Sequence, residues 1–121
     1  MSQKIFILDD DEKACQLAKR VLEKAGYDVS GQTQAIGATS AIKSFMPDLV
    51  LLDVMMPALS GDNLVEIMSK IIRPRPKVLF YSNKSSEELR DLVSETGIEG
   101  FVCKVEGPGA LVTAVKDTLG E

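Results

Sequence analysis

The sequence predicts an α/β domain in which five βα units build a parallel five-stranded sheet covered by helices on both faces. Two observations support this prediction. Short runs of β-branched and apolar residues alternate with stretches whose apolar residues recur at helical spacing. The 121 residues, of which 45% are hydrophobic and 26% charged, suffice for one domain with an ordinary core, to which we assign residues 1–121.

The strands are predicted at five short apolar runs. These are Lys4 to Leu8, Asp28 to Gly31, Asp48 to Asp53, Lys77 to Ser82 and Gly100 to Cys103. A segment with helical periodicity follows each run, so consecutive strands are expected to run parallel. The connections contain no internal repeat, linker or low-complexity tract.

Three of the predicted helices carry recognisable end signals. The first spans about Glu12 to Ala25, with Asp11 as its N-cap and Gly26 as its stop. The fourth opens with a capping-box pattern at Ser85–Glu88, and the fifth has Pro108 near its start. The residues expected on their buried faces are Cys15, Ala18, Val21, Leu22 and Ala25, then Leu89, Leu92 and Val93, then Leu111, Ala114, Val115 and Thr118.

The second and third helices have a less regular pattern. In the second, Gly37, Thr39 and Ser40 have low helix propensity, and Met46-Pro47 ends it. The third stops at Arg73–Pro76, where two prolines interrupt the pattern. The apolar stripes are predicted at Ile36, Ala41, Ile42 and Phe45 in the second helix, and at Leu64, Ile67, Met68, Ile71 and Ile72 in the third.

Charge and composition exclude several classes of function. The 14 basic and 18 acidic residues give a net charge of -4, so direct nucleic-acid binding is not expected. No apolar run reaches the roughly 20 residues that span a bilayer, and Met1–Lys4 leads straight into a strand instead of a signal peptide, so we expect a cytoplasmic protein without membrane insertion. Cys15 and Cys103 lack metal-ligand spacing and are expected to be buried apolar residues. The absence of histidine excludes His-based catalysis and His metal sites.

Polar residues end four of the five predicted strands. Asp9–Asp11 follow the first strand, Asp53 ends the third, Ser82 the fourth, and Lys104 follows the fifth. In open parallel α/β sheets, ligands bind outside the carboxyl ends of the strands, so these side chains are expected to meet at one edge. Two carboxylates about 4 Å apart repel by roughly 4 kcal/mol at an effective dielectric of about 20, so the cluster needs a countercharge.

A divalent cation is the predicted countercharge. Hard oxygen ligands without His or Cys favour Mg²⁺, which binds one or two carboxylates and keeps waters that a phosphate can displace. Taken singly, Asp9–Asp11 resemble an acidic helix cap, Asp53 and Ser82 resemble turn residues, and Lys104 resembles a solvated loop lysine. The conjunction of these residue types at one edge favours a functional site.

Three groups of segments resemble the receiver domains of bacterial response regulators over essentially the whole chain. They are Ile5–Asp10, then Pro47–Pro57 with Ser60-Gly61, and then Val78–Ser82 with Gly100–Lys104. The resemblance implies the flavodoxin-like fold, with strand order 2-1-3-4-5 as in the family's chemotaxis member. It also implies a two-component signalling switch, in which a partner histidine kinase or phosphotransfer protein supplies the phosphohistidine.

The resemblance implies a role for each site residue. Asp53 would accept the phosphoryl group, and Asp10, Asp53 and the backbone carbonyl of Met55 would ligate Mg²⁺, with Asp9 acting through water. Ser82 and Lys104 would stabilise the phosphoryl oxygens, since the loose transition state calls for positioning and charge stabilisation.

The resemblance also implies how the signal leaves the site. When Ser82 is drawn towards the phosphoryl group, Phe101 would swing inward and repack the surface of the fourth helix, fifth strand and fifth helix. A static core position is the alternative for Phe101. A downstream effector, an output domain outside this chain or a phosphorylation-dependent homodimer would read that surface.

Two features depart from the family pattern or tune it. Val105 stands where a proline usually follows the lysine, so we expect a trans peptide or a rearranged loop after Lys104. Met55 and Lys84 occupy positions that flank the path of hydrolytic water in the family. We hypothesise that Met55 shields the acylphosphate and lengthens its life.

Three other functions compete with the phospho-acceptor. A phosphate-independent pseudo-receiver is expected to lack the acceptor or the acidic pair, and both are present. A Mg²⁺-dependent phosphohydrolase with an aspartyl-phosphate intermediate would need a second Asp where Met55 stands. A flavodoxin-like FMN carrier would need a phosphate-binding loop after the first strand, where Asp9–Glu12 would repel phosphate.

Overall fold

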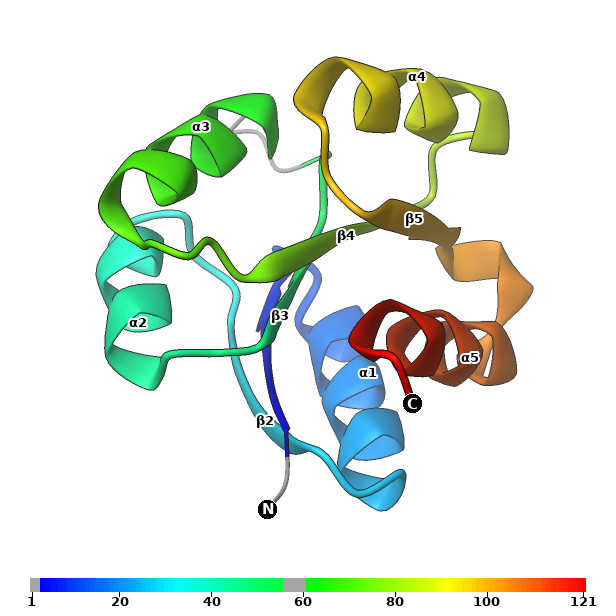
Figure 1. Cartoon of the computed structure of the whole chain (residues 1–121). Coiled ribbons are helices and arrows are strands. Elements are labelled where there is room, and N and C mark those ends of the chain that lie inside the picture. The colour runs from blue at the N-terminus through cyan, green and yellow to red at the C-terminus, as the bar shows by residue number, and fades with distance from the viewer. Residues whose placement is uncertain (1–2, 56–60) are drawn as a thin grey trace.

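The computed structural model describes residues 3–55 and 61–121 (Figure 1). A parallel five-stranded sheet forms its centre, in the order β2-β1-β3-β4-β5, so the predicted fold class and topology are confirmed. The strands are β1 (Lys4–Leu8), β2 (Asp28–Gln32), β3 (Leu49–Leu52), β4 (Lys77–Ser82) and β5 (Gly100–Cys103). The motif residues 56–60 lie outside the described part.

The strand predictions differ from the structure only at their ends. The third strand was predicted to include Asp48 and Asp53, but these two carboxylates flank β3. Asp48 accepts a hydrogen bond from the backbone N–H of Lys4 at 2.7 Å, while the N–H of Asp53 donates to the carbonyl of Leu8 at 2.9 Å. Both residues therefore prolong the contact between β1 and β3 beyond the strand itself.

The helices are divided between the two faces of the sheet (Figure 1). They are α1 (Glu12–Lys24), α2 (Ala38–Phe45), α3 (Gly61–Ile71), α4 (Ser86–Thr96) and α5 (Pro108–Leu119), with a short 3-10 turn at Lys104–Glu106. Helices α1 and α5 cover one face, and α2, α3 and α4 cover the other. Across residues 3–55 and 61–121, no helix combines the length and apolarity that a membrane crossing requires.

The helix ends confirm the predicted capping signals. Asp11 caps α1 by accepting hydrogen bonds from the N–H groups of Lys13 and Ala14, and Gly26 follows with a left-handed φ of 102°. The hydroxyl of Ser85 accepts a hydrogen bond from the N–H of Glu88 at 3.2 Å at the start of α4. These caps satisfy backbone N–H groups that have no partner inside the helix.

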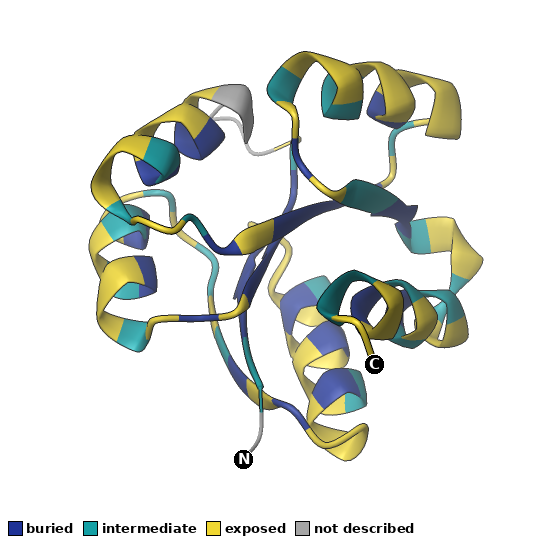
Figure 2. Ribbon diagram, viewed as in Figure 1, coloured by how far each residue is buried: buried dark blue, intermediate teal, exposed yellow. Residues whose placement is uncertain are grey.

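Buried residues form two apolar layers, one on each face of the sheet (Figure 2). The α1 and α5 layer contains Cys15, and the layer beneath α2, α3 and α4 contains Cys103, so the prediction of two buried, unbridged cysteines is confirmed. Successive residues of β4 enter alternate layers, because side chains alternate across a strand. Phe80 packs in the second layer and Tyr81 in the first.

Three predicted apolar stripes were partly wrong. Ala25, predicted on the buried face of the first helix, is exposed because α1 ends at Lys24. Ile36 precedes α2 and is 89% exposed, because the left-handed Gly37 is the N-cap and Ala38, the first helical residue, takes the buried position. In α3, Ile67 and Ile71 are exposed, while Val65 packs in the core. Successive residues of a helix are turned by about 100°, and the centre of the buried face of α3 lies between the directions of Leu64 and Val65. Ile67 and Ile71 therefore lie to one side of that face.

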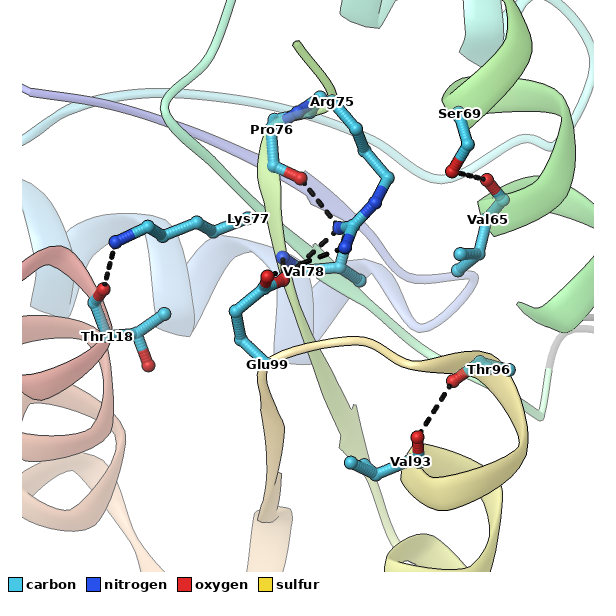
Figure 3. Close-up of polar contacts among 10 residues, drawn as sticks. All are labelled: Val65, Ser69, Arg75, Pro76, Lys77, Val78, Val93, Thr96, Glu99 and Thr118. Atoms are coloured by element: carbon cyan, nitrogen blue, oxygen red, sulfur yellow. Dashed lines mark hydrogen bonds and ion pairs between the residues drawn. The ribbon is translucent and has the colours of Figure 1, made fainter.

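Glu99, in the turn before β5, links three segments at the sheet edge opposite the polar strand ends (Figure 3). Its carboxylate accepts a hydrogen bond from the N–H of Val78 at 2.8 Å and pairs with Arg75 at 3.2 Å. Nearby, the ammonium of Lys77 donates to the carbonyl of Thr118 at 2.8 Å, which ties β4 to the end of α5. These contacts fix where β4 and β5 begin and hence how their far ends align.

Replacing Glu99 with Ala should lower the free energy of unfolding by roughly 1–3 kcal/mol, because the N–H of the buried Val78 loses its acceptor. Glu99→Gln should lose less, since the amide oxygen can still accept that bond. Urea unfolding of both variants beside the wild type measures the difference. Equal losses would show that the ion pair with Arg75, and not the hydrogen bond to Val78, carries the stabilisation.

Candidate functional site

The sheet register brings the predicted site residues together at the carboxyl edge. Leu8 lies opposite Leu52, so Asp9 and Asp53 leave β1 and β3 side by side. Ser82 lies opposite Cys103, so Lys104 emerges next to the end of β4. Parallel pairing in register therefore gathers two carboxylates, a hydroxyl and an ammonium at one edge, as the sequence predicted.

Three carboxylates meet at this edge. Asp9, Asp10 and Asp53 each place a carboxylate oxygen within 4.8 Å of the other two. Asp9 and Asp53 are buried, whereas Asp10 is exposed. A buried pair with an exposed third member opens towards solvent, from which a ligand can enter.

Lys104 lies against both buried carboxylates. Its ammonium is 2.7 Å from Asp9 Oδ2 and 3.5 Å from Asp53 Oδ2. Burial lowers the pKa of Lys104, but the two carboxylates outweigh it and the pKa is raised overall, so the ammonium stays charged. One ammonium therefore pairs with two buried carboxylates.

The Asp53 carboxylate is oriented by its own backbone. Its Oδ1 accepts a hydrogen bond from the N–H of Met55 at 2.9 Å, and its Oδ2 faces Lys104. Burial raises the pKa of Asp53 to about 6, although the Met55 N–H and the Lys104 ammonium favour the charged form. The group is therefore mostly ionised at neutral pH, with one oxygen directed into the cluster.

One carboxylate oxygen of Asp9 is buried without a hydrogen-bond partner among the described residues. Its Oδ1 accepts a hydrogen bond from the N–H of Asp11 at 3.0 Å. Its buried Oδ2 has the charge of Lys104 beside it but, within the described part of the chain, accepts no hydrogen bond of good geometry. A buried carboxylate oxygen with spare acceptor capacity, beside two further carboxylates, fits a divalent cation with oxygen ligands.

Ser82 and Phe101 lie on the face of the sheet that α4 covers. Ser82 is completely buried, and its hydroxyl oxygen accepts a hydrogen bond from the N–H of Lys84 at 3.3 Å. Phe101 is half-buried and packs against the core layer on that face. The ammonium of Lys84 pairs with Glu88 on α4 at 3.4 Å, so its side chain is engaged with the helix.

The peptide after Lys104 is trans, one of the two outcomes expected for a lysine without a following proline. Lys104–Glu106 form a 3-10 turn that ends at the left-handed Gly107, with φ 90°. Val105 is 85% exposed. The turn places Lys104 at the site, but the exposed side chain of Val105 does not cover it.

Sequence reasoning missed Tyr81. Its ring centroid lies 5.5 Å from the Lys104 ammonium, on the face of the sheet opposite Ser82. Its place inside an apolar strand run gave no signal of this contact.

Comparison with known proteins agrees with this geometry. The family model of the response regulator receiver domain matches residues 5–116. The chain is 30% identical over 117 residues to the chemotaxis protein CheY of Thermotoga maritima, covering 95% of this chain and 96% of that protein. A CheY-like response regulator receiver domain protein from Methanospirillum hungatei has a similar structure, with a TM-score of 0.87, 27% identity, and coverage of 99% and 95%.

A second relative is longer than this chain. The alkaline phosphatase synthesis transcriptional regulatory protein PhoP of Bacillus subtilis is 31% identical over 121 residues, which cover 98% of this chain and 49% of PhoP. The chain belongs to the response regulator receiver domain family, the signal-receiving module of two-component systems.

The raised pKa of Asp53 predicts that the free energy of unfolding depends on pH when a chelator keeps divalent cations away from the site. Because the folded pKa of about 6 exceeds the ordinary value of 3.8, the folded state binds more protons between these values, and stability falls as pH rises through them. The free energy of unfolding of the wild type, relative to Asp53→Asn, should fall by on the order of 2–3 kcal/mol between about pH 4 and pH 7. Denaturant titrations across this range test it, and parallel curves for the two proteins would contradict it.

Proposed function

We propose that this domain is a magnesium-dependent phospho-acceptor switch in which Asp53 takes a phosphoryl group from a phosphohistidine on another protein. The observation that carries the proposal is the Asp53 carboxylate itself. It is buried at the sheet edge, close to two further carboxylates and 3.5 Å from the Lys104 ammonium. These 121 residues contain no histidine, so the phosphohistidine must lie outside them.

The donor set supports magnesium. Asp10 and Asp53 would ligate it directly with the Met55 carbonyl, and Asp9 would act through a water molecule. Asp10 suits direct ligation because it is exposed, whereas Asp9 is buried, with its Oδ2 2.7 Å from the Lys104 ammonium. When bound, the ion would supply positive charge for the phosphoryl oxygens.

The residues of the chain can then perform the transfer. An oxygen of Asp53 forms a bond to phosphorus while the bond from phosphorus to the donor imidazole nitrogen breaks, and the imidazole leaves. The Met55 N–H holds the other carboxylate oxygen and so orients the nucleophile. Lys104 and the Ser82 hydroxyl stabilise charge on the phosphoryl oxygens. Attack by water later removes the group and resets the domain.

The output is proposed to pass through Ser82 and Phe101. Drawing the Ser82 hydroxyl towards the phosphoryl group vacates space beside β4, and Phe101, half-buried on the same face, can move in without burying a polar atom. This would change the surface of α4, β5 and α5, where an effector, an output domain outside this chain or a second copy would bind. The cytoplasmic location and the homodimer stay predictions.

Specific observations argue against two alternative functions, a phosphohydrolase and a pseudo-receiver. A phosphohydrolase would place a second carboxylate two residues after the acceptor, where Met55 presents an apolar side chain that is 52% exposed. A pseudo-receiver would have no need of three clustered carboxylates with one lysine, an arrangement that is electrostatically costly to keep. The domain is therefore proposed to act as a signalling switch and not as an enzyme on external substrates.

Incubation with acetyl phosphate and Mg²⁺ should add one phosphoryl group to the wild type, as read by intact mass, and none when chelator replaces Mg²⁺. Asp53→Ala should abolish the label. Asp48→Asn is the matched control, since Asp48 flanks the same strand at its opposite end. A label that survives in Asp53→Ala would overturn the assignment of the acceptor, and an unlabelled wild type would favour the pseudo-receiver.

Met55→Asn should shorten the lifetime of the acylphosphate several-fold, because the apolar side chain beside Asp53 is replaced by one that can bind the attacking water. Loss of label after removal of acetyl phosphate measures the rate for both proteins. Lys84→Met provides a comparison at the second flanking position, where the ammonium already pairs with Glu88. Equal or slower loss from Met55→Asn would contradict the shielding role.

A further inference from the structure

Tyr81 lies beneath the site on the side opposite Ser82. It is the fifth residue of β4, pairs with Val102 of β5, and is only 7% exposed. Its ring packs in the apolar layer formed with α1 and α5, and the Lys104 ammonium lies over that ring, 5.5 Å from its centroid. The aromatic ring therefore joins the core to the ammonium that, within residues 3–55 and 61–121, pairs with the buried carboxylates.

Lys104 needs lateral support that its own loop does not provide. The two residues that follow, Val105 and Glu106, are exposed, and Gly107 then turns the chain into α5. The Lys104 side chain is nonetheless only 12% exposed. Its cover must come from the neighbouring strand and helices, where the Tyr81 ring stands directly against the ammonium.

We propose that Tyr81 is a positioning residue for Lys104, whose ring holds the ammonium at the sheet edge while that ammonium exchanges Asp9 for a phosphoryl oxygen. The inference rests on the proposed function, because it concerns a step of phosphoryl transfer. The attraction of a cation to an aromatic face needs no hydrogen bond, so it persists when the hydrogen-bonding partner changes. A carboxylate in the same place would compete with the phosphoryl group for the lysine.

The surroundings of the ring strengthen this interaction. A small pocket of about 40 Å³ lies between α1 and the start of α5, lined in part by Tyr81, Lys104 and Leu111. Its apolar walls lower the local dielectric, which makes the attraction between ring and cation larger than at an open surface.

The ring, and not the hydroxyl, is the active part. Burial raises the pKa of Tyr81 while the Lys104 charge opposes the rise, so the hydroxyl stays neutral beside the ammonium. Within residues 3–55 and 61–121, that hydroxyl makes no side-chain hydrogen bond. Removing it should therefore leave the position of Lys104 unchanged, whereas removing the ring should not.

The test compares phosphorylation rates with acetyl phosphate and saturating Mg²⁺ in the full chain. Tyr81→Leu should slow labelling about tenfold, equivalent to about 1.4 kcal/mol in the barrier, and Tyr81→Phe should stay within about twofold of the wild type. Tyr81→Met is a second ring-free variant that fills the space flexibly. Tyr27→Leu is the matched control, because Tyr27, the only other tyrosine, is also 7% exposed and packs in the same layer.

A spectroscopic readout separates positioning from stability. In the wild type and Tyr81→Phe, NMR should show the side-chain methylene protons of Lys104 shifted upfield by the ring current, and in the ring-free variants this shift should vanish. Thermal unfolding of each variant reports any loss of the fold. Tyr27→Leu should lower the unfolding temperature while leaving both the Lys104 shifts and the labelling rate near wild type.

The outcomes distinguish the two proposals. A labelled wild type with Tyr81→Leu and Tyr81→Met equally fast would overturn the positioning role alone, as would Tyr81→Phe as slow as the ring-free variants. Slowing of Tyr27→Leu to the same extent would assign the effect to general destabilisation and overturn it too. A wild type that accepts no phosphoryl group overturns the proposed function and this inference with it.

Discussion

The ion pair between Lys104 and the buried carboxylates of Asp9 and Asp53 is the interaction around which the site is organised. Two unit charges about 4 Å apart repel by roughly 4 kcal/mol at an effective dielectric of about 20, so the fold must hold these carboxylates together against their mutual repulsion. A single ammonium leaves the cluster with an excess of negative charge once Asp10 is included. The magnesium ion proposed above would balance that excess charge.

The sheet can hold such a cluster because the polar groups at the opposite ends of the strands are paired with one another. At the edge where β4 and β5 begin, Glu99 satisfies the N–H of Val78 and pairs with Arg75, so charges there are neutralised and backbone groups are bonded. Between the edges, two apolar layers fix the register of five strands. Misalignment by one residue would turn Asp9 or Ser82 away from the site, because side chains alternate along a strand. The packing of the sheet between its apolar layers therefore determines where the side chains at the carboxyl ends of the strands lie.

The sequence predicted the elements whose signals are local or repeated along the chain. Alternation of strand-like and helical runs predicted the topology, and polar residues at strand ends predicted which side chains meet. The exposed Ile67 and the buried Val65 were mispredicted, because the direction of the core around α3 is set by the packing of neighbouring helices and not by the helix's own pattern. Tyr81 was missed because its contact with Lys104 joins two strands across the sheet, and no feature of either residue alone indicates it. The roles of the site residues are not settled by position and stay predictions.

Lys104 reaches the carboxylate cluster without a proline after it. A following proline would restrict the backbone beyond the lysine, whereas here a 3-10 turn leads to a left-handed glycine and an exposed valine. The constraint on the ammonium has therefore moved from the chain that follows it to the side chains that surround it, namely two carboxylates and an aromatic ring. The carboxylates draw the ammonium into the cluster, and the ring is proposed to hold it there during phosphoryl transfer. Backbone rigidity and side-chain packing are thus alternative ways to place the same charge.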